Sequence, residues 1–129
     1  MDHTIVHFEI PADDVAKLKT FYGDLFGWKM EKVPGFESMD YHMVTTVPVD
    51  ENMKPLRRGV NGGIYKKQDQ QSKFTYYVQV ESADEYSKKI EELGGKITAP
   101  KMEIPNMGWV VFALDPEGNA FSIFEEKTG

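Results

Sequence analysis

The sequence carries the same order of elements twice. Each half has a short strand, an amphipathic helix that ends at glycine, and three more short strands, which indicates a duplicated supersecondary unit. Residues 7–10 precede a helix ending at Gly27, and residues 76–80 precede a helix ending at Gly94. A sheet of one such unit cannot cover both of its faces. Two units side by side therefore predict a shared concave cleft that is suited to a small ligand.

Length and composition indicate one domain over residues 1–129. The repeated order of helix and strands makes it an α+β fold, with module one at about 1–67 and module two at about 73–129. No run approaches the roughly 18 apolar residues of a membrane span, and no secretory signal pattern opens the chain. The absence of cysteine excludes disulfide and thiolate chemistry, and cytoplasmic residence is expected. A net charge of −6 argues against a nucleic-acid partner, because phosphate contacts require clustered cations.

Both helices have recognisable starts and ends. In the first, apolar residues recur every three or four positions from Val15, and either Asp13 or Asp14 can supply the N-cap oxygen. In the second, Ser82 and Glu85 have the spacing of a capping box. The apolar stripes of both helices are interpreted as core rather than as a cofactor site.

Further strands are expected where aromatic and β-branched residues gather, over 41–46, 64–66, 109–114 and 119–124. The run 115–118, Asp-Pro-Glu-Gly, predicts a hairpin turn between the last two. In the final strand Phe121 and Ile123 should share one face, leaving Ser122 and Phe124 on the other. Residues 47–59 form the one long loop.

These motifs resemble the vicinal-oxygen-chelate superfamily of glyoxalases, bleomycin-resistance proteins and extradiol dioxygenases. The resemblance rests on four segments: His-Phe-Glu-Ile-Pro at 7–11, Leu-Phe-Gly-Trp at 25–28, Leu-Gly-Gly-Lys at 93–96 and Asp-Pro-Glu-Gly-Asn at 115–119. More narrowly, the chain is similar to small glyoxalase-related proteins. The resemblance implies two tandem βαβββ modules, a U-shaped cleft and frequent dimerisation.

The resemblance also implies four strand positions that hold a divalent metal in many relatives. His7 stands at the first position, but the others fall near Gly63, at Thr75 and at Ser122. One imidazole with two hydroxyls is a poor match to a catalytic metal site, which generally has three strong protein ligands. We therefore predict no metal of the family type and no other cofactor. A non-standard divalent site that recruits His3 or His42 stays open.

The expected ligand cleft combines hydroxyl groups with aromatic walls, a composition suited to a small organic molecule. Its residues are His7, Thr75, Tyr77, Trp109, Ser122 and Phe124. Trp109 and Phe124 can equally be plain core. His7 and Glu9 are the candidate catalytic residues, because residues two apart on a strand point the same way, although Glu9 also fits a surface carboxylate.

Three classes of function follow. The leading interpretation is a small-molecule-binding protein of the bleomycin-resistance kind without the family metal site. The second is a glyoxalase-related lyase or isomerase with a non-standard or degenerate metal site. The third is a structural or regulatory dimer whose cleft is filled by its own side chains. In each case a homodimer is expected, because open sheet edges and apolar walls would otherwise stay exposed.

Overall fold

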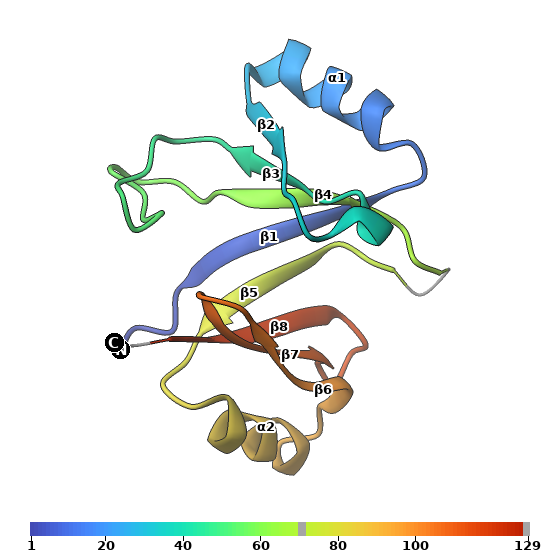
Figure 1. The fold of residues 1–129 in the computed structure, drawn as a ribbon. Coiled ribbons are helices and arrows are strands. Elements are labelled where there is room, and N and C mark those ends of the chain that lie inside the picture. Colours follow the sequence, from blue (N-terminus) through green and yellow to red (C-terminus); the bar gives the residue numbers. More distant parts are fainter. Residues whose placement is uncertain (70–71, 128–129) are drawn as a thin grey trace. The chain divides into compact units, whose positions relative to one another are not determined.

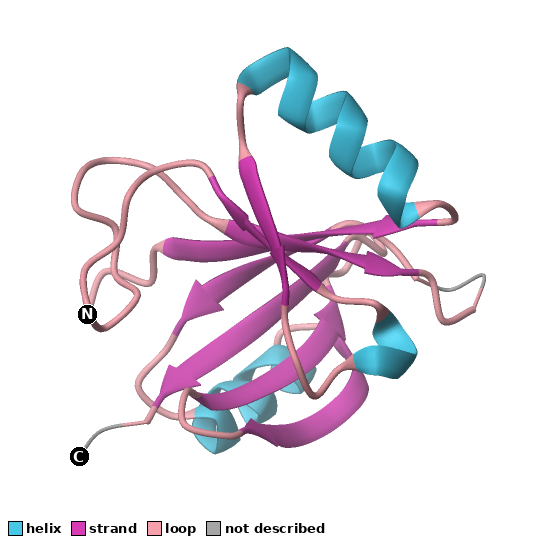
Figure 2. Cartoon of the chain, turned by 45° about the horizontal axis from the view of Figure 1, so that its top comes forward, coloured by secondary structure: helices cyan, strands magenta, loops and turns pink. Residues whose placement is uncertain are grey.

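The computed structural model describes residues 1–69 and 72–127, and its elements alternate in the order expected of two βαβββ modules (Figures 1 and 2). The elements are β1 (Ile5–Ala12), α1 (Val15–Phe26), β2 (Lys29–Lys32), the 3-10 helix η1 (Glu37–Met39), β3 (His42–Thr45), β4 (Gly62–Lys66), β5 (Thr75–Gln79), α2 (Ala83–Glu92), β6 (Lys96–Ile104), β7 (Gly108–Leu114) and β8 (Ala120–Glu126). The α+β fold class is confirmed.

The chain divides into two compact units. One comprises His7–Phe74, here called the first unit. The other, the second unit, combines Met1–Val6 with the chain from Thr75 onward. The first six residues belong to the second unit, where His3 Nε2 lies 2.9 Å from Glu81 Oε1 and 3.1 Å from the Tyr86 hydroxyl. No helix in the described ranges is long and apolar enough to cross a membrane.

In the first unit the strands lie in the order β2-β3-β4-β1, with β1 and β4 parallel and the other pairs antiparallel. Helix α1 lies against one face of this sheet (Figure 1). The core between them is built on Ala12, Val15, Val44 and Ile64. Strand alternation then places Phe8 and Ile10 toward α1, and His7 and Glu9 on the opposite face.

Helix α1 begins and ends where its caps dictate. Asp14, rather than Asp13, is the N-cap: its carboxylate accepts a hydrogen bond from the backbone N–H of Lys17 at 3.1 Å. At the other end Gly27 adopts the left-handed conformation, with φ of 73°. Helix α2 repeats the pattern with Ser82 as N-cap, whose hydroxyl accepts from the Glu85 N–H at 3.1 Å.

In the second unit the strand order is β5-β8-β7-β6, with β5 and β8 parallel and the remaining pairs antiparallel. Helix α2 covers one face, over a core of Val80, Ala83, Val111 and Ile123. The expected hairpin between β7 and β8 is present. Its turn is held by the Asp115 carboxylate, which accepts from the backbone N–H groups of Glu117 and Asn119, both at 2.9 Å.

The long loop is more ordered internally than its composition indicates. The side-chain oxygen of Asn61 accepts from the backbone N–H groups of Thr46 at 2.7 Å and of Val47 at 3.0 Å, and an isolated bridge pairs Val49 with Pro55. Asn61 thereby fastens both ends of the loop beside the start of β4. The glycines that follow can then enter the strand in register with β1.

Candidate functional site

Three polar side chains converge on the face of β1 that is turned away from α1; we call His7, Glu9 and Tyr41 the β1 polar cluster. His7 Nε2 lies 3.0 Å from the Tyr41 hydroxyl and 3.4 Å from Glu9 Oε2. The His7 and Glu9 side chains keep 31% and 14% of their surface exposed. The cluster is thus partly shielded from water but reachable. It brings together the two candidate catalytic residues with a tyrosine that sequence reasoning had not singled out.

The glycine at position 63 makes this cluster possible. Gly63 pairs with Glu9 across the parallel β1–β4 ladder. A Cβ added to Gly63 would collide with the hydroxyl and ring of Tyr41. Tyr41 therefore occupies the space of the missing side chain, at the position where the superfamily resemblance implies a metal ligand. No periodicity in the sequence signals this contact, because Tyr41 and Gly63 lie on different elements.

The protonation of Tyr41 follows from its surroundings. Burial, then the negative charge of Glu9, then the hydrogen bond to Glu9 together raise the pKa of the Tyr41 phenol above its usual range. The phenol is therefore neutral and donates its proton toward the Glu9 carboxylate. Its oxygen lies 3.0 Å from His7 Nε2, and it accepts there when the imidazole carries its proton on Nε2. Burial likewise raises the pKa of nearby Tyr65, with Glu9 adding to the effect.

The other two histidines do not join His7. His42 is buried and pairs through Nε2 with Asp40 Oδ1 at 2.8 Å, while its Nδ1 has no hydrogen-bond partner. Its ladder partner is Ile64, a residue of the α1-facing core, so His42 lies on the opposite sheet face from His7. The hydrogen bond from His42 is the main reason that the pKa of Asp40 is lowered. His3 belongs to the second unit and is engaged by Glu81 and Tyr86.

The residues present do not fit the superfamily's metal chelate. Gly63 has no side chain, and the hydroxyls of Thr75 and Ser122 lie 3.3 Å apart, hydrogen-bonded to each other. Within residues 1–69 and 72–127, no group of three or more histidine, aspartate or glutamate side chains is arranged to hold a metal ion. Neutral hydroxyl groups of this kind are weak ligands for a transition metal.

In the second unit the expected cleft residues divide between two sheet faces. Ser122 pairs with Tyr77 on β5 and with Phe112 on β7, which places Thr75, Tyr77, Ser122 and Phe124 on one face. Ser122 is fully buried, and Thr75 and Tyr77 are nearly so, whereas Phe124 is half-buried.

Trp109 does not share that face. Its side chain packs against the core beneath α2, together with Phe121 and Ile97. The Nζ atoms of Lys101 and Lys127 lie 5.3 and 5.9 Å from the centre of its ring. The expectation that Trp109 stands beside Ser122 and Phe124 is corrected by the strand register. The alternative interpretation, Trp109 as core, describes its position.

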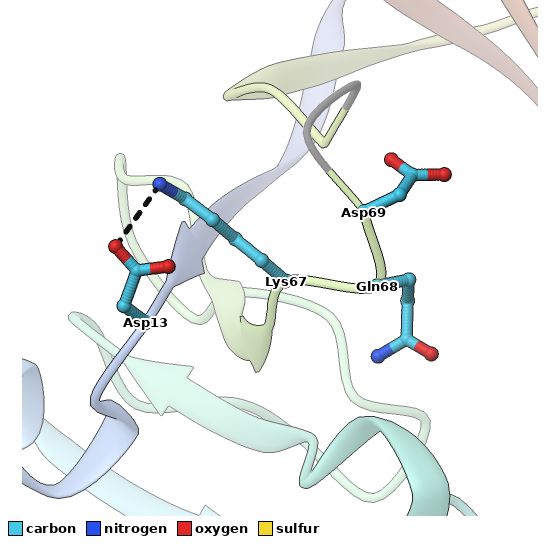
Figure 3. A pocket seen from close by; sticks show the side chains of 4 residues that line it. All are labelled: Asp13, Lys67, Gln68 and Asp69. Atoms are coloured by element: carbon cyan, nitrogen blue, oxygen red, sulfur yellow. Dashed lines mark hydrogen bonds and ion pairs between the residues drawn. The ribbon is translucent and has the colours of Figure 1, made fainter.

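A surface hollow in the first unit is lined by Asp13, Lys67, Gln68 and Asp69 (Figure 3). Lys67 Nζ approaches Asp13 Oδ2 at 3.4 Å, while Gln68 and Asp69 point away from that pair. Asp13 is 86% exposed, so water screens the ion pair and the pair adds little to stability. These side chains do not converge on a common centre, in contrast to the β1 polar cluster.

Comparison with known proteins places this geometry in a family. Residues 4–46 match a family model described as bleomycin resistance protein-like N-terminal. The anthracycline biosynthesis protein DnrV of Streptomyces peucetius is 28% identical over 126 residues and aligns with 92% of this chain. A glyoxalase/bleomycin resistance protein/dioxygenase superfamily member from Vibrio splendidus superposes with a TM-score of 0.64 at 12% identity, covering 95% of this chain and 98% of that one. The sequence over residues 4–46, and the fold over nearly the whole chain, are thus those of the glyoxalase/bleomycin-resistance/dioxygenase superfamily.

The chain spans about half, 46%, of the length of DnrV. It is also similar to the Streptomyces coelicolor methylmalonyl-CoA epimerase, with a TM-score of 0.65 and 13% identity, over 96% of this chain and 97% of that one. That epimerase was solved in complex with 2-nitronate-propionyl-CoA. At such low identity the structural likeness shows the fold alone.

Proposed function

We propose that this superfamily member binds a small organic molecule at the β1 polar cluster, without the superfamily's usual metal chelate. The observation that carries the proposal is the convergence of His7, Glu9 and Tyr41 on one partly exposed face, with Nε2 of His7 within 3.4 Å of both partners. The His7 and Glu9 side chains keep 31% and 14% of their surface exposed, so a ligand can reach hydrogen-bonding groups at this position.

The cluster can recognise hydroxyl and carbonyl oxygens. The Glu9 carboxylate accepts hydrogen bonds, and His7 can donate or accept as its tautomer changes. Within the second unit, taken by itself, we retain a separate proposed ligand-binding face with the expected aromatic and hydroxyl composition, without Trp109. It consists of Thr75, Tyr77, Ser122 and Phe124.

A structural or regulatory role is the second candidate. Ser122, Thr75 and Tyr77 expose 0%, 6% and 5% of their surface, as expected of an interior filled by the protein's own side chains. An enzyme of the lyase or isomerase type is the third, favoured by the approach of His7 Nε2 to within 3.4 Å of Glu9 Oε2. A carboxylate beside an imidazole is an arrangement suited to proton transfer.

We also propose that the chain forms a homodimer. Three large apolar side chains of the α1 stripe that was expected to be core, Phe21, Leu25 and Phe26, are instead more than half exposed. A second copy of the chain would cover such a surface. Light scattering should give about twice the chain mass of 14.7 kDa at micromolar concentration. A single species at the chain mass would contradict this proposal.

A thermal-shift screen of small organic molecules tests the binding function. Compounds that raise the melting temperature of the wild-type protein should lose most of that effect with His7→Ala and with Glu9→Gln. His3→Ala is the matched control, because His3 lies in the second unit and contacts Glu81 and Tyr86 instead. Hits that respond equally in all three variants would place binding elsewhere, and a screen without hits would favour the structural role.

A further inference from the structure

We infer that the ligand of the β1 polar cluster carries a phenolic hydroxyl, and that Tyr41 occupies the site as an internal stand-in which such a ligand displaces. The inference rests on the proposed binding function and adds to it the chemical class of the ligand. It also assigns Tyr41 a role: the residue competes with the ligand and thereby regulates its binding.

The first step is the fit of the site to a phenol. The Tyr41 hydroxyl is bound on two sides, by His7 Nε2 at 3.0 Å and by the Glu9 carboxylate. Its ring lies directly against the backbone of Gly63, where any other residue would collide with it. The site therefore accepts a flat ring above a glycine and one oxygen between an imidazole and a carboxylate. A phenolic ligand has both of these features.

The second step is the origin of Tyr41 in a connecting segment rather than in the sheet. It immediately precedes β3, after a stretch in which Gly35 and Asp40 have positive φ angles of 92° and 45°. Aspartate is one of the few residues with a side chain that adopts the left-handed conformation, so these two positions mark turns in the segment before the tyrosine. The backbone of Tyr41 is fixed by a 2.9 Å hydrogen bond from the Val33 N–H to its carbonyl. Displacement therefore requires the side chain to rotate while the main chain stays.

The third step is the selection of a phenol over other oxygen compounds. The negative charge of Glu9 disfavours carboxylate and phosphate ligands at this point, since like charges in a shielded site repel strongly. Aliphatic alcohols would lack the ring contact that Tyr41 now makes with Phe36, at 6.0 Å between ring centres. Burial and Glu9 keep the Tyr41 phenol neutral, and they would act on a bound phenol in the same way.

Competition with Tyr41 has a measurable consequence. A ligand that binds only when Tyr41 has rotated away has its affinity reduced by the fraction of molecules in that state. Removing the ring by Tyr41→Ala removes the competition. The variant should therefore bind a phenolic probe at least about tenfold more tightly than the wild-type protein does.

The experiment uses p-cresol as the probe and toluene as its matched control, because toluene has the same ring and methyl group without the hydroxyl. Titration calorimetry on Tyr41→Ala should give tight p-cresol binding, about tenfold or more weaker toluene binding, and loss of the difference when Glu9→Gln is added. In the wild-type protein, p-cresol should bind more weakly and shift the NMR signals of the His7 and Tyr41 rings together.

Two results would overturn the inference. Equal binding of toluene and p-cresol by Tyr41→Ala would mean a merely apolar cavity, and absence of any His7 or Tyr41 signal change in the wild type would mean that no displacement occurs. The wild-type measurement decides the question even where Tyr41→Ala does not fold. Screening hits that lose their effect in His7→Ala but contain no phenolic group would contradict this inference and leave the proposed binding function intact.

Discussion

The phenolic hydroxyl of Tyr41 lies in the space that a side chain on Gly63 would occupy. Gly63 is otherwise an ordinary residue of β4, paired in register with Glu9 and Met43. Because Gly63 has no Cβ, a tyrosine from a neighbouring segment can reach the polar side chains of β1. One glycine thus determines whether His7 and Glu9 meet a hydroxyl at all.

The first prediction is that Gly63→Ala destabilises the protein. The new methyl group meets the Tyr41 ring, so the ring must leave or the strands must shift. Overpacking of this kind costs about 1–3 kcal/mol of the free energy of unfolding. Urea unfolding followed by circular dichroism gives the value, and the His7 ring signal should change in the same variant.

Gly23→Ala is the matched control. Gly23 lies within α1, where a Cβ would meet only the Trp28 carbonyl at a relaxed 3.8 Å. Alanine there should stabilise by about 0.5–1 kcal/mol, because glycine is unfavourable inside a helix. Equal stability of Gly63→Ala and the wild-type protein would mean that Tyr41 does not rest on Gly63.

The second prediction concerns Ser122, which is fully buried and whose hydroxyl lies 3.3 Å from that of Thr75. Ser122→Leu should overpack this position and lower the free energy of unfolding by about 1–3 kcal/mol. Ser122→Ala is the control, since it adds no volume and leaves Thr75 a 3.4 Å bond to the Tyr76 carbonyl. A melting temperature of Ser122→Leu equal to that of Ser122→Ala would indicate an open position rather than packed interior.

Much of the fold could be predicted because its signals are local. The caps at Asp14 and Ser82 and the turn at Asp115 each depend on residues within a few positions of one another. The sheet face on which Trp109 lies could also be predicted from the sequence. The turn pairs Leu114 with Ala120, and counting back by twos pairs Phe112 with Ser122 and leaves Trp109 on the other face.

The site was less accessible to sequence reasoning. His7 and Glu9 share a face by strand alternation, and this much was predicted. The position of the Tyr41 hydroxyl depends on a contact across 22 positions of the chain, between an irregular segment and β4. Side-chain contacts between separate elements leave no periodic pattern in a single sequence. The part that Tyr41 plays in the cluster therefore could not be predicted.

The third prediction is that no tight divalent metal is bound through His7. Gly63, Thr75 and Ser122 offer at most two neutral hydroxyls at the remaining positions, and these are weak ligands. Protein purified without chelator should contain well under one equivalent of zinc, nickel, iron or manganese by mass spectrometry. Near-stoichiometric metal that disappears in His7→Ala, but persists in His3→Ala, would contradict it.

The fourth prediction concerns the acid stability of the β7–β8 hairpin. Hydrogen bonds from the backbone N–H and the side-chain amide of Asn119 are the main reason that the pKa of Asp115 falls below its ordinary 3.8, and the N–H groups of Glu117 and Gly118 add to them. A carboxyl whose pKa is lower in the folded state stabilises that state while it is ionised. Its contribution is therefore complete above the pKa of the unfolded chain and is lost as the pH falls through the lower, folded value.

Unfolding measured between pH 6 and about pH 2 should show this dependence directly. Wild-type protein should be more stable than Asp115→Asn near neutral pH, and the gap should narrow as the pH falls below the ordinary 3.8 of that carboxyl. Glu117→Gln serves as the control, because Glu117 joins the turn through its backbone N–H, at 2.9 Å from Asp115 Oδ1. A gap between wild type and Asp115→Asn that stays constant over the whole range would show that ionisation of Asp115 does not stabilise the turn.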